Sequence, residues 1–200
     1  MGENRTVNYH VLPLILPSGL QDVANGRLPA SKLEPLHSYP KGKLYPAARL
    51  AFDALALEAY FTGHELKPTS PADCYRSYDR QESGFLQRYS PKNTGRTPRV
   101  TRIYQGRPWY LKPGVAPMAT PGTSNHGLGL AVDVANASGD LLEWLLGPNG
   151  FESPAIRYGF SWEVANGPNA EPWHIRYVCG DNPPPAVLEA VAAFPDLETK

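Results

Sequence analysis

The stretch Ser124–Asp133 has the sequence SNHGLGLAVD and joins a tight turn to the start of a buried strand. Its glycines let the backbone turn closely after His126, because glycine adopts conformations that other residues avoid. The strand expected at 130–134 is apolar except for Asp133, whose side chain points to the face opposite that of its valine neighbours. A carboxylate in such a strand is costly to bury unless it is paired or bound to a cation. We therefore expect His126 and Asp133 to meet at one polar site.

The sequence EPWH at Glu171–His174 supplies a second imidazole and a second carboxylate. A hydrolytic zinc site uses three ligands from neutral His and ionised Asp or Glu, and it keeps a fourth position open for water. His126, Asp133 and His174 match that ligand set. The proline after Glu171 restricts this residue to extended conformations, and a carboxylate beside the ion can accept a proton from the bound water. Taken singly, each segment also fits an ordinary turn or strand, and only the combination favours a metal site.

The composition excludes several classes of protein. Two hundred residues are enough for one domain with its own core, and no linker or repeat divides the chain, so we expect a single domain over 1–200. The apolar runs are much shorter than the roughly 20 residues that cross a bilayer. Nineteen basic and nineteen acidic residues cancel, so the summed charge does not favour nucleic acid. We expect a monomer without a transmembrane segment or a nucleic-acid partner.

The spacing of apolar residues predicts an α+β fold. A core helix is expected between Pro46 and Gly63, with a buried face made of Leu50, Ala54, Leu57 and Phe61. Further helices are expected after Ser77 and at 138–147, 153–159 and 185–194, strands at 130–134 and 174–179, a hairpin at 99–112, and a loop-rich segment at 1–44. Because few helices alternate with the strands, we expect a central antiparallel sheet flanked by helices, with the zinc site at the sheet.

The cysteines and the N-terminus leave alternatives open. Cys74 and Cys179 form no CxxC pair, which excludes a zinc ribbon and a thioredoxin-like motif, but both a disulfide and two buried thiols remain possible. The first residues lack the features of a secretory signal peptide. A cytosolic chain, a mature chain without its signal and a protein released by lysis are all consistent with this N-terminus.

Three blocks of sequence in the same order resemble one family. The pattern SxHxxGxAxD at 124–133, followed by ExWH at 171–174, is similar to the LAS metallopeptidases, and in particular to their D-alanyl-D-alanine carboxypeptidase (VanY-like) branch among bacterial cell-wall peptidases. The segment CYRSYDRQ at 74–81 resembles the SGYRSxxxQ of that family, although Asp73 and Cys74 replace its Ser-Gly. The resemblance covers about residues 22–180, and chance agreement of three ordered blocks is improbable.

The resemblance implies a set of site residues. It implies one zinc ion held by His126, Asp133 and His174, with Glu171 as the general base. Arg76 is implied to stabilise the oxyanion, which suits a permanently charged guanidinium, and an ion pair with Asp73 or Asp79 is its alternative role. The positions implied to contact substrate are Ser77, Gln81, Ser124 and Trp173. Helix capping by Ser77 and turn formation by Ser124 are the corresponding structural alternatives.

The resemblance also implies a function. The expected enzyme is a zinc peptidase that hydrolyses an amide bond in the peptidoglycan stem peptide at the cell wall. The order Trp173-His174 resembles the D,D-carboxypeptidase branch more than the L-alanyl-D-glutamate endopeptidases. Two alternatives remain: a phage or lysis-released endolysin that cuts the L-alanyl-D-glutamate bond, and a non-catalytic zinc-containing module that binds the cell wall, since hedgehog signalling domains carry zinc on the same scaffold.

Overall fold

Short helices and three small antiparallel sheets make up the protein in the computed structural model, which describes residues 7–93, 100–147, 152–167 and 169–198. The helices are α1 (Pro46–Phe61), α2 (Tyr78–Arg88), α3 (Gly139–Leu146), α4 (Pro154–Arg157) and α5 (Pro185–Ala193). The strands are β1 (Glu34–Pro35), β2 (Lys43–Leu44), β3 (Tyr89–Ser90), β4 (Thr101–Tyr104), β5 (Arg107–Leu111), β6 (Ala131–Asp133), β7 (Phe160–Ser161) and β8 (His174–Tyr177). The predicted α+β class is confirmed. In the described part of the chain, no helix is both long enough and apolar enough to cross a bilayer.

The sheet that matters for function has the strand order β6-β8-β7 and is antiparallel throughout. Its register pairs Asp133 directly with His174. Directly opposed residues in an antiparallel pair project to the same face of the sheet. The pairing of two segments that are far apart in sequence therefore places two of the predicted ligands side by side.

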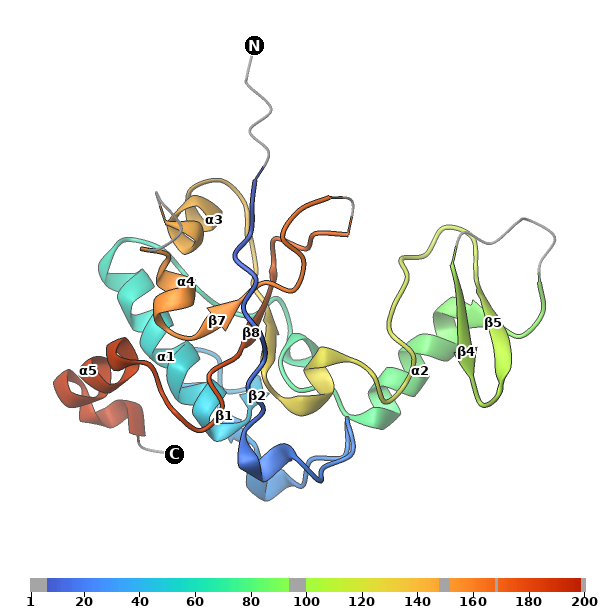
Figure 1. The fold of residues 1–200 in the computed structure, drawn as a ribbon, viewed down its shortest axis with the longest axis horizontal. Coiled ribbons are helices and arrows are strands. Elements are labelled where there is room, and N and C mark those ends of the chain that lie inside the picture. Colours follow the sequence, from blue (N-terminus) through green and yellow to red (C-terminus); the bar gives the residue numbers. More distant parts are fainter. Residues whose placement is uncertain (1–6, 94–99, 148–151, 168, 199–200) are drawn as a thin grey trace, which may run out of the picture.

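Helix α1 lies beside this sheet (Figure 1), and Phe52 meets Phe160 of β7 edge to face with ring centroids 5.9 Å apart. Most of the buried residues of the helix are alanines. The helix begins at Pro46 as predicted. The predicted buried face is wrong in part, because Leu50 and Leu57 are only half-buried and Phe61 is 64% exposed. Small alanine side chains let a helix approach a sheet closely, whereas Phe61 contacts Phe194 near the end of the chain.

Helix α2 and the sheet β3-β5-β4 form a second lobe that stands beside the main one (Figure 1). This lobe has its own aromatic core, made of Phe85, Tyr89, Tyr104 and Trp109. The predicted hairpin is present as β4 and β5, and both residues of its turn, Gln105 and Gly106, have positive φ angles. Such a turn matches the twist of the two strands that it connects.

Both cysteines are free thiols. Burial is the main cause that raises the pKa of Cys74 to about 12, and burial also raises the pKa of the half-buried Cys179 thiol. Because the thiolate is the reactive form, we expect Cys74 to resist alkylation in the native protein. After unfolding without reductant, mass spectrometry should show two alkyl groups per chain. A mass that shows no alkylation until a reductant is added would instead reveal a disulfide.

Candidate metal centre and active-site cleft

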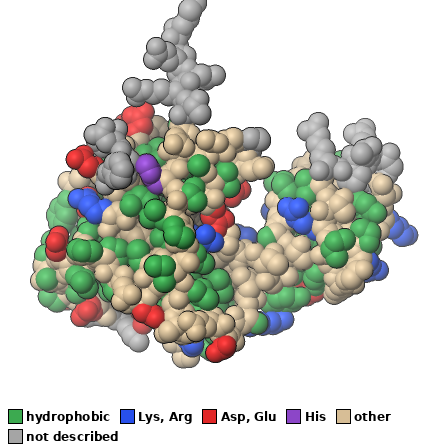
Figure 2. All heavy atoms as spheres, in the orientation of Figure 1, with side chains coloured by type: hydrophobic (Ala, Val, Ile, Leu, Met, Phe, Trp, Pro, Cys, Tyr) green, Lys and Arg blue, Asp and Glu red, His purple; other side chains and the backbone are tan. Residues whose placement is uncertain are grey.

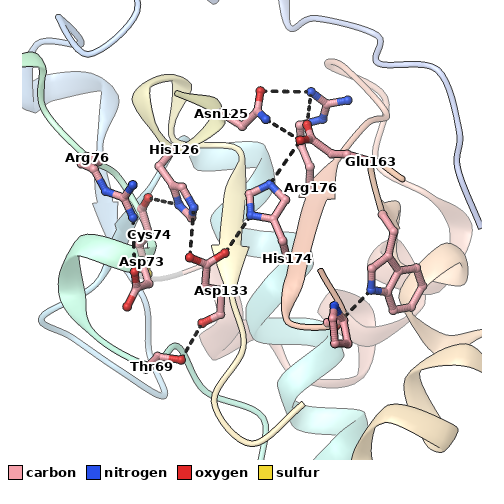
Figure 3. Close-up of polar contacts among 12 residues, drawn as sticks. Thr69, Asp73, Cys74, Arg76, Asn125, His126, Asp133, Glu163, His174 and Arg176 are labelled. Atoms are coloured by element: carbon pink, nitrogen blue, oxygen red, sulfur yellow. Dashed lines mark hydrogen bonds and ion pairs between the residues drawn. The ribbon is translucent and has the colours of Figure 1, made fainter. Parts of the chain in front are cut away.

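The three predicted ligands come together where β6 and β8 meet (Figure 3). His126 lies in a single turn of 3-10 helix, Asn125–Leu128, that leads into β6. Gly129 ends this turn with a φ of 67°, and a Cβ there would lie 3.0 Å from the backbone nitrogen of Tyr45. Only glycine combines this conformation with so close an approach. The turn therefore holds His126 against the end of β6, where Asp133 and His174 already face each other.

The distances between the ligand atoms fit a metal ion. Nε2 of His126 lies 3.3 Å from Oδ2 of Asp133, and Nδ1 of His174 lies 2.7 Å from Oδ1 of Asp133. One ligand atom from each of the three residues lies within 4.8 Å of the others. A tetrahedral ion with bonds of about 2.1 Å separates its ligand atoms by about 3.4 Å, so small side-chain adjustments suffice to enclose zinc.

The electrostatics of the cluster keep its carboxylate ionised. Burial favours a protonated Asp133, but hydrogen bonds and positive charge from His126 and His174 outweigh that effect and hold the pKa of Asp133 well below its usual value. The two histidines are themselves buried, with 4% and 6% of their surface exposed. An ionised carboxylate between two buried imidazoles is a donor set that zinc prefers.

Backbone contacts determine which nitrogen of His126 can bind a metal. Nδ1 of His126 lies 3.0 Å from the carbonyl oxygen of Cys74, to which it can donate a hydrogen bond. The backbone N–H of Arg76 in turn donates to the carbonyl of His126. A histidine that donates through one ring nitrogen presents the other as a ligand, so this contact directs Nε2 toward Asp133. Cys74, which departs from the family pattern, thus contributes its carbonyl group to the site.

Glu163 and Arg176 are site residues that the sequence analysis missed. Nε2 of His174 is buried without a hydrogen-bond partner, and Oε2 of Glu163 lies 3.7 Å from it, on the side away from Asp133 (Figure 3). Glu163 forms an ion pair with Arg176 and accepts a hydrogen bond from the side chain of Asn125. The one available sequence signal was alternation along β8, which places residue 176 on the same face as residue 174.

Replacing Glu163 with glutamine is expected to weaken zinc binding by about tenfold, because outer partners fix the orientation and basicity of a ligating histidine. Competition titration against a chelator of known affinity measures this change. Glu143→Gln is the matched control, since Glu143 is exposed on α3 and does not line the cleft. Wild-type affinity in Glu163→Gln would show that Glu163 does not orient His174.

The cluster forms the floor of an open cleft of about 690 Å³. The walls come from the segments around the ligands, from α2, and from the segment 116–119 that returns from the second lobe. Of the other predicted site residues, those that line this cleft are Arg76, Ser124, Glu171 and Trp173. Glu171 is exposed, and Trp173 is 44% exposed beside it.

Ser77 and Gln81 lie outside the cleft lining. Ser77 caps α2, and its hydroxyl accepts a hydrogen bond from the backbone of Arg80. The side chain of Gln81 is fully buried and bonds to Asn25, to the carbonyl of Arg76 and to the N–H of Gly122. The contacts of both residues are structural, and their role in binding substrate stays a prediction.

Arg76 lies in the cleft, as its expected role in catalysis requires, and it also forms the ion pair with Asp73 that was its alternative role. Its guanidinium lies 3.3 Å from a carboxylate oxygen of Asp73 and donates to the carbonyl of Ala72, while the side chain lines the cleft. Asp79 is paired with Arg27 and is not a partner of Arg76. These contacts hold the guanidinium in place, and its remaining N–H groups can serve a bound substrate.

Two buried histidines and a half-buried aspartate, on the floor of a cleft that also contains a further carboxylate, are typical of metal-dependent hydrolases. The profile of the VanY family, D-alanyl-D-alanine carboxypeptidase, matches residues 41–180. The chain belongs to this family.

Several solved structures are similar to the chain. A VanY D,D-pentapeptidase variant from a VanB-type resistance cassette, in complex with Zn(II), is 24% identical over 78% of this chain and 86% of that chain, with a TM-score of 0.45. The LdcB LD-carboxypeptidase is 26% identical over 86% and 80% of the two chains, with a TM-score of 0.42. VanYB in complex with D-alanine-D-alanine is 22% identical over 91% of each chain, with a TM-score of 0.47. Comparison with curated proteins finds no significant match.

Proposed function

We propose that the protein is a zinc-dependent peptidase that removes the terminal D-alanine from the peptidoglycan stem peptide. The observation that carries this proposal is the cluster of His126, Asp133 and His174 on the floor of the cleft, in a chain of the D-alanyl-D-alanine carboxypeptidase family. Peptidoglycan lies in the cell wall, so we place the reaction there. We further propose that the protein acts as a monomer.

The donor set supports one zinc ion as the cofactor. Two imidazole nitrogens and one carboxylate oxygen are common ligands of catalytic zinc, which keeps its fourth position for water. Among the described residues, this is the single group of His, Cys, Asp and Glu side chains that could hold an ion in this way. When bound, zinc lowers the pKa of a coordinated water and polarises a carbonyl oxygen.

The protein side chains supply the remaining chemistry. Glu171 lines the cleft, and its carboxylate can accept a proton from the attacking water and then donate it to the nitrogen of the leaving D-alanine. The guanidinium of Arg76 can stabilise the negative charge that develops on the carbonyl oxygen, because it is permanently charged and already oriented by Asp73. Trp173 also lines the cleft, where its indole would limit the access of water.

Two features favour this function over its alternatives. The family description and the order Trp173-His174 both favour a D,D-carboxypeptidase over an L-alanyl-D-glutamate endopeptidase. A binding module has no need for a free carboxylate in the cleft, and among the described residues the Glu171 side chain has no ionic or hydrogen-bonded partner.

The test is hydrolysis of a synthetic stem pentapeptide by the zinc-loaded protein, with products identified by mass spectrometry. We expect release of a single D-alanine, and no release after the metal has been removed with a chelator. Cleavage between L-alanine and D-glutamate would instead establish an endolysin-type specificity. A zinc-loaded protein that cleaves neither bond would support the binding module.

A further inference from the structure

Helix α2 turns one of its faces toward the cleft. The residues of α2 that line the cleft are Arg80, Ser83, Gly84, Gln87 and Arg88. Their spacing of three and four residues places them along one side of the helix, so they form a continuous row. The row offers two guanidinium groups, a hydroxyl and an amide, and it contains no carboxylate.

The two arginines of this row have no acidic partner. Among the described residues, neither Arg80 nor Arg88 forms an ion pair, and the guanidinium of Arg88 contacts the sulfur of Met118 at 3.1 Å. Arg80 is exposed, whereas Arg88 is half-buried. A partly desolvated guanidinium without a counter-charge is unfavourable unless a ligand supplies one. The two acidic residues of α2 do not neutralise the row, because Asp79 pairs with Arg27 and Glu82 accepts a hydrogen bond from Tyr104.

The rest of the cleft lining carries the acidic residues. Three of the carboxylates there, Asp73, Asp133 and Glu163, are each engaged by an arginine or by the histidine ligands, and the fourth, Glu171, has no partner among the described residues. Figure 2 shows a hollow between the two lobes, with both acidic and basic side chains at its edge on the main lobe. Of the three arginines that line the cleft in the described part of the chain, Arg76 is paired with Asp73, so an acidic ligand that reacts at the cluster finds the arginines without an acidic partner on α2.

We infer that this face of α2 is a subsite for the free carboxylates that the stem peptide carries on the N-terminal side of the bond that is cut. The inference rests on the proposed function, because it assigns the acidic part of the same substrate. Arg80 and Arg88 are eight residues apart, which corresponds to about 12 Å along a helix. An extended peptide covers that distance with about three or four residues. The length of the row therefore equals that of the three or four residues that precede the cleaved bond in a short stem peptide, when that bond lies at the cluster.

The experiment compares two synthetic stem pentapeptides that differ only in their second and third residues, whose side carboxylates are free in one peptide and amidated in the other. Calorimetric titration uses zinc-loaded protein carrying Glu171→Gln, so that binding is measured without turnover. We expect the free acid to bind about tenfold more tightly, with a preference that weakens as salt is added. Adding Arg80→Gln and Arg88→Gln should reduce this preference to less than about twofold.

Arg107→Gln is the matched control, since Arg107 is exposed on β5 and does not line the cleft, and it should keep the full preference. If the double substitution impairs folding, judged by circular dichroism and zinc content, Arg80→Gln alone should still lower the preference. Equal binding of the two peptides, or an unchanged preference in the arginine variants, would overturn the inference. Failure of the proposed function is a separate result, namely that wild-type protein hydrolyses neither peptide.

Discussion

Replacing His126 with alanine is expected to lower the affinity for zinc by more than about 100-fold, because the loss of a ligand exceeds the 10- to 100-fold effect of losing an outer partner. The substitution removes Nε2, which lies 3.3 Å from Oδ2 of Asp133, on a ring whose Nδ1 is held by the carbonyl of Cys74. Wild-type protein should retain about one equivalent of zinc after dialysis, by the ligand count of one tetrahedral site. Elemental analysis of the two dialysed proteins measures the difference.

His64→Ala is the matched control for this substitution. His64 stacks on Trp144 with ring centroids 5.1 Å apart and does not line the active-site cleft, so zinc content should not change. Bound zinc should also raise the melting temperature of wild-type protein, because a ligand that binds only the folded state stabilises it by about 2.7 kcal/mol at 100 times its Kd. Retention of one zinc per chain in His126→Ala would refute the ligand assignment.

Replacing Glu171 with glutamine is expected to reduce kcat for stem-peptide hydrolysis by about 10²- to 10⁴-fold, the usual contribution of a general acid–base group. Zinc content should stay at the wild-type level, because Glu171 is not one of the three clustered ligands. The turn that carries Glu171 is held by the indole of the buried Trp162, which donates to the carbonyl of Pro172. The amide side chain fits the same space, so the loss reports proton transfer.

Steady-state kinetics and metal analysis of the same preparation separate these two effects. Glu143→Gln, on the exposed side of α3, should keep wild-type kcat. An unchanged rate of hydrolysis in Glu171→Gln would show that another residue acts as the general base. Glu163 also lines the cleft, but its ion pair with Arg176 and its position behind His174 make it poorly suited to that task.

The cluster of His126, Asp133 and His174 could be predicted from the sequence because short segments around each ligand restrict the backbone there. The turn at His126, the polar residue in an apolar strand and the short EPWH segment each restrict the backbone within a few residues. The register of β6 and β8 then follows, because pairing Asp133 with His174 also pairs Val132 with Ile175 on the buried face.

What the sequence did not predict depends on packing between distant segments. Glu163 becomes part of the site because β7 pairs with the end of β8, where Ser161 lies opposite Arg176. Glu163 follows β7 by two residues and forms an ion pair with Arg176. The buried face of α1 was misassigned because helical spacing alone does not show which apolar row meets the sheet. Small alanine side chains were favoured over Leu57 and Phe61 by close approach to the sheet.

The separate aromatic core of the second lobe has an evolutionary consequence. Phe85, Tyr89, Tyr104 and Trp109 stabilise α2 and its hairpin without help from the packing around the metal ligands. Substitutions on the outer side of the hairpin can therefore accumulate while the catalytic centre stays intact. Related chains can therefore change their substrate specificity through substitutions in the second lobe, while the metal ligands of the main lobe stay the same.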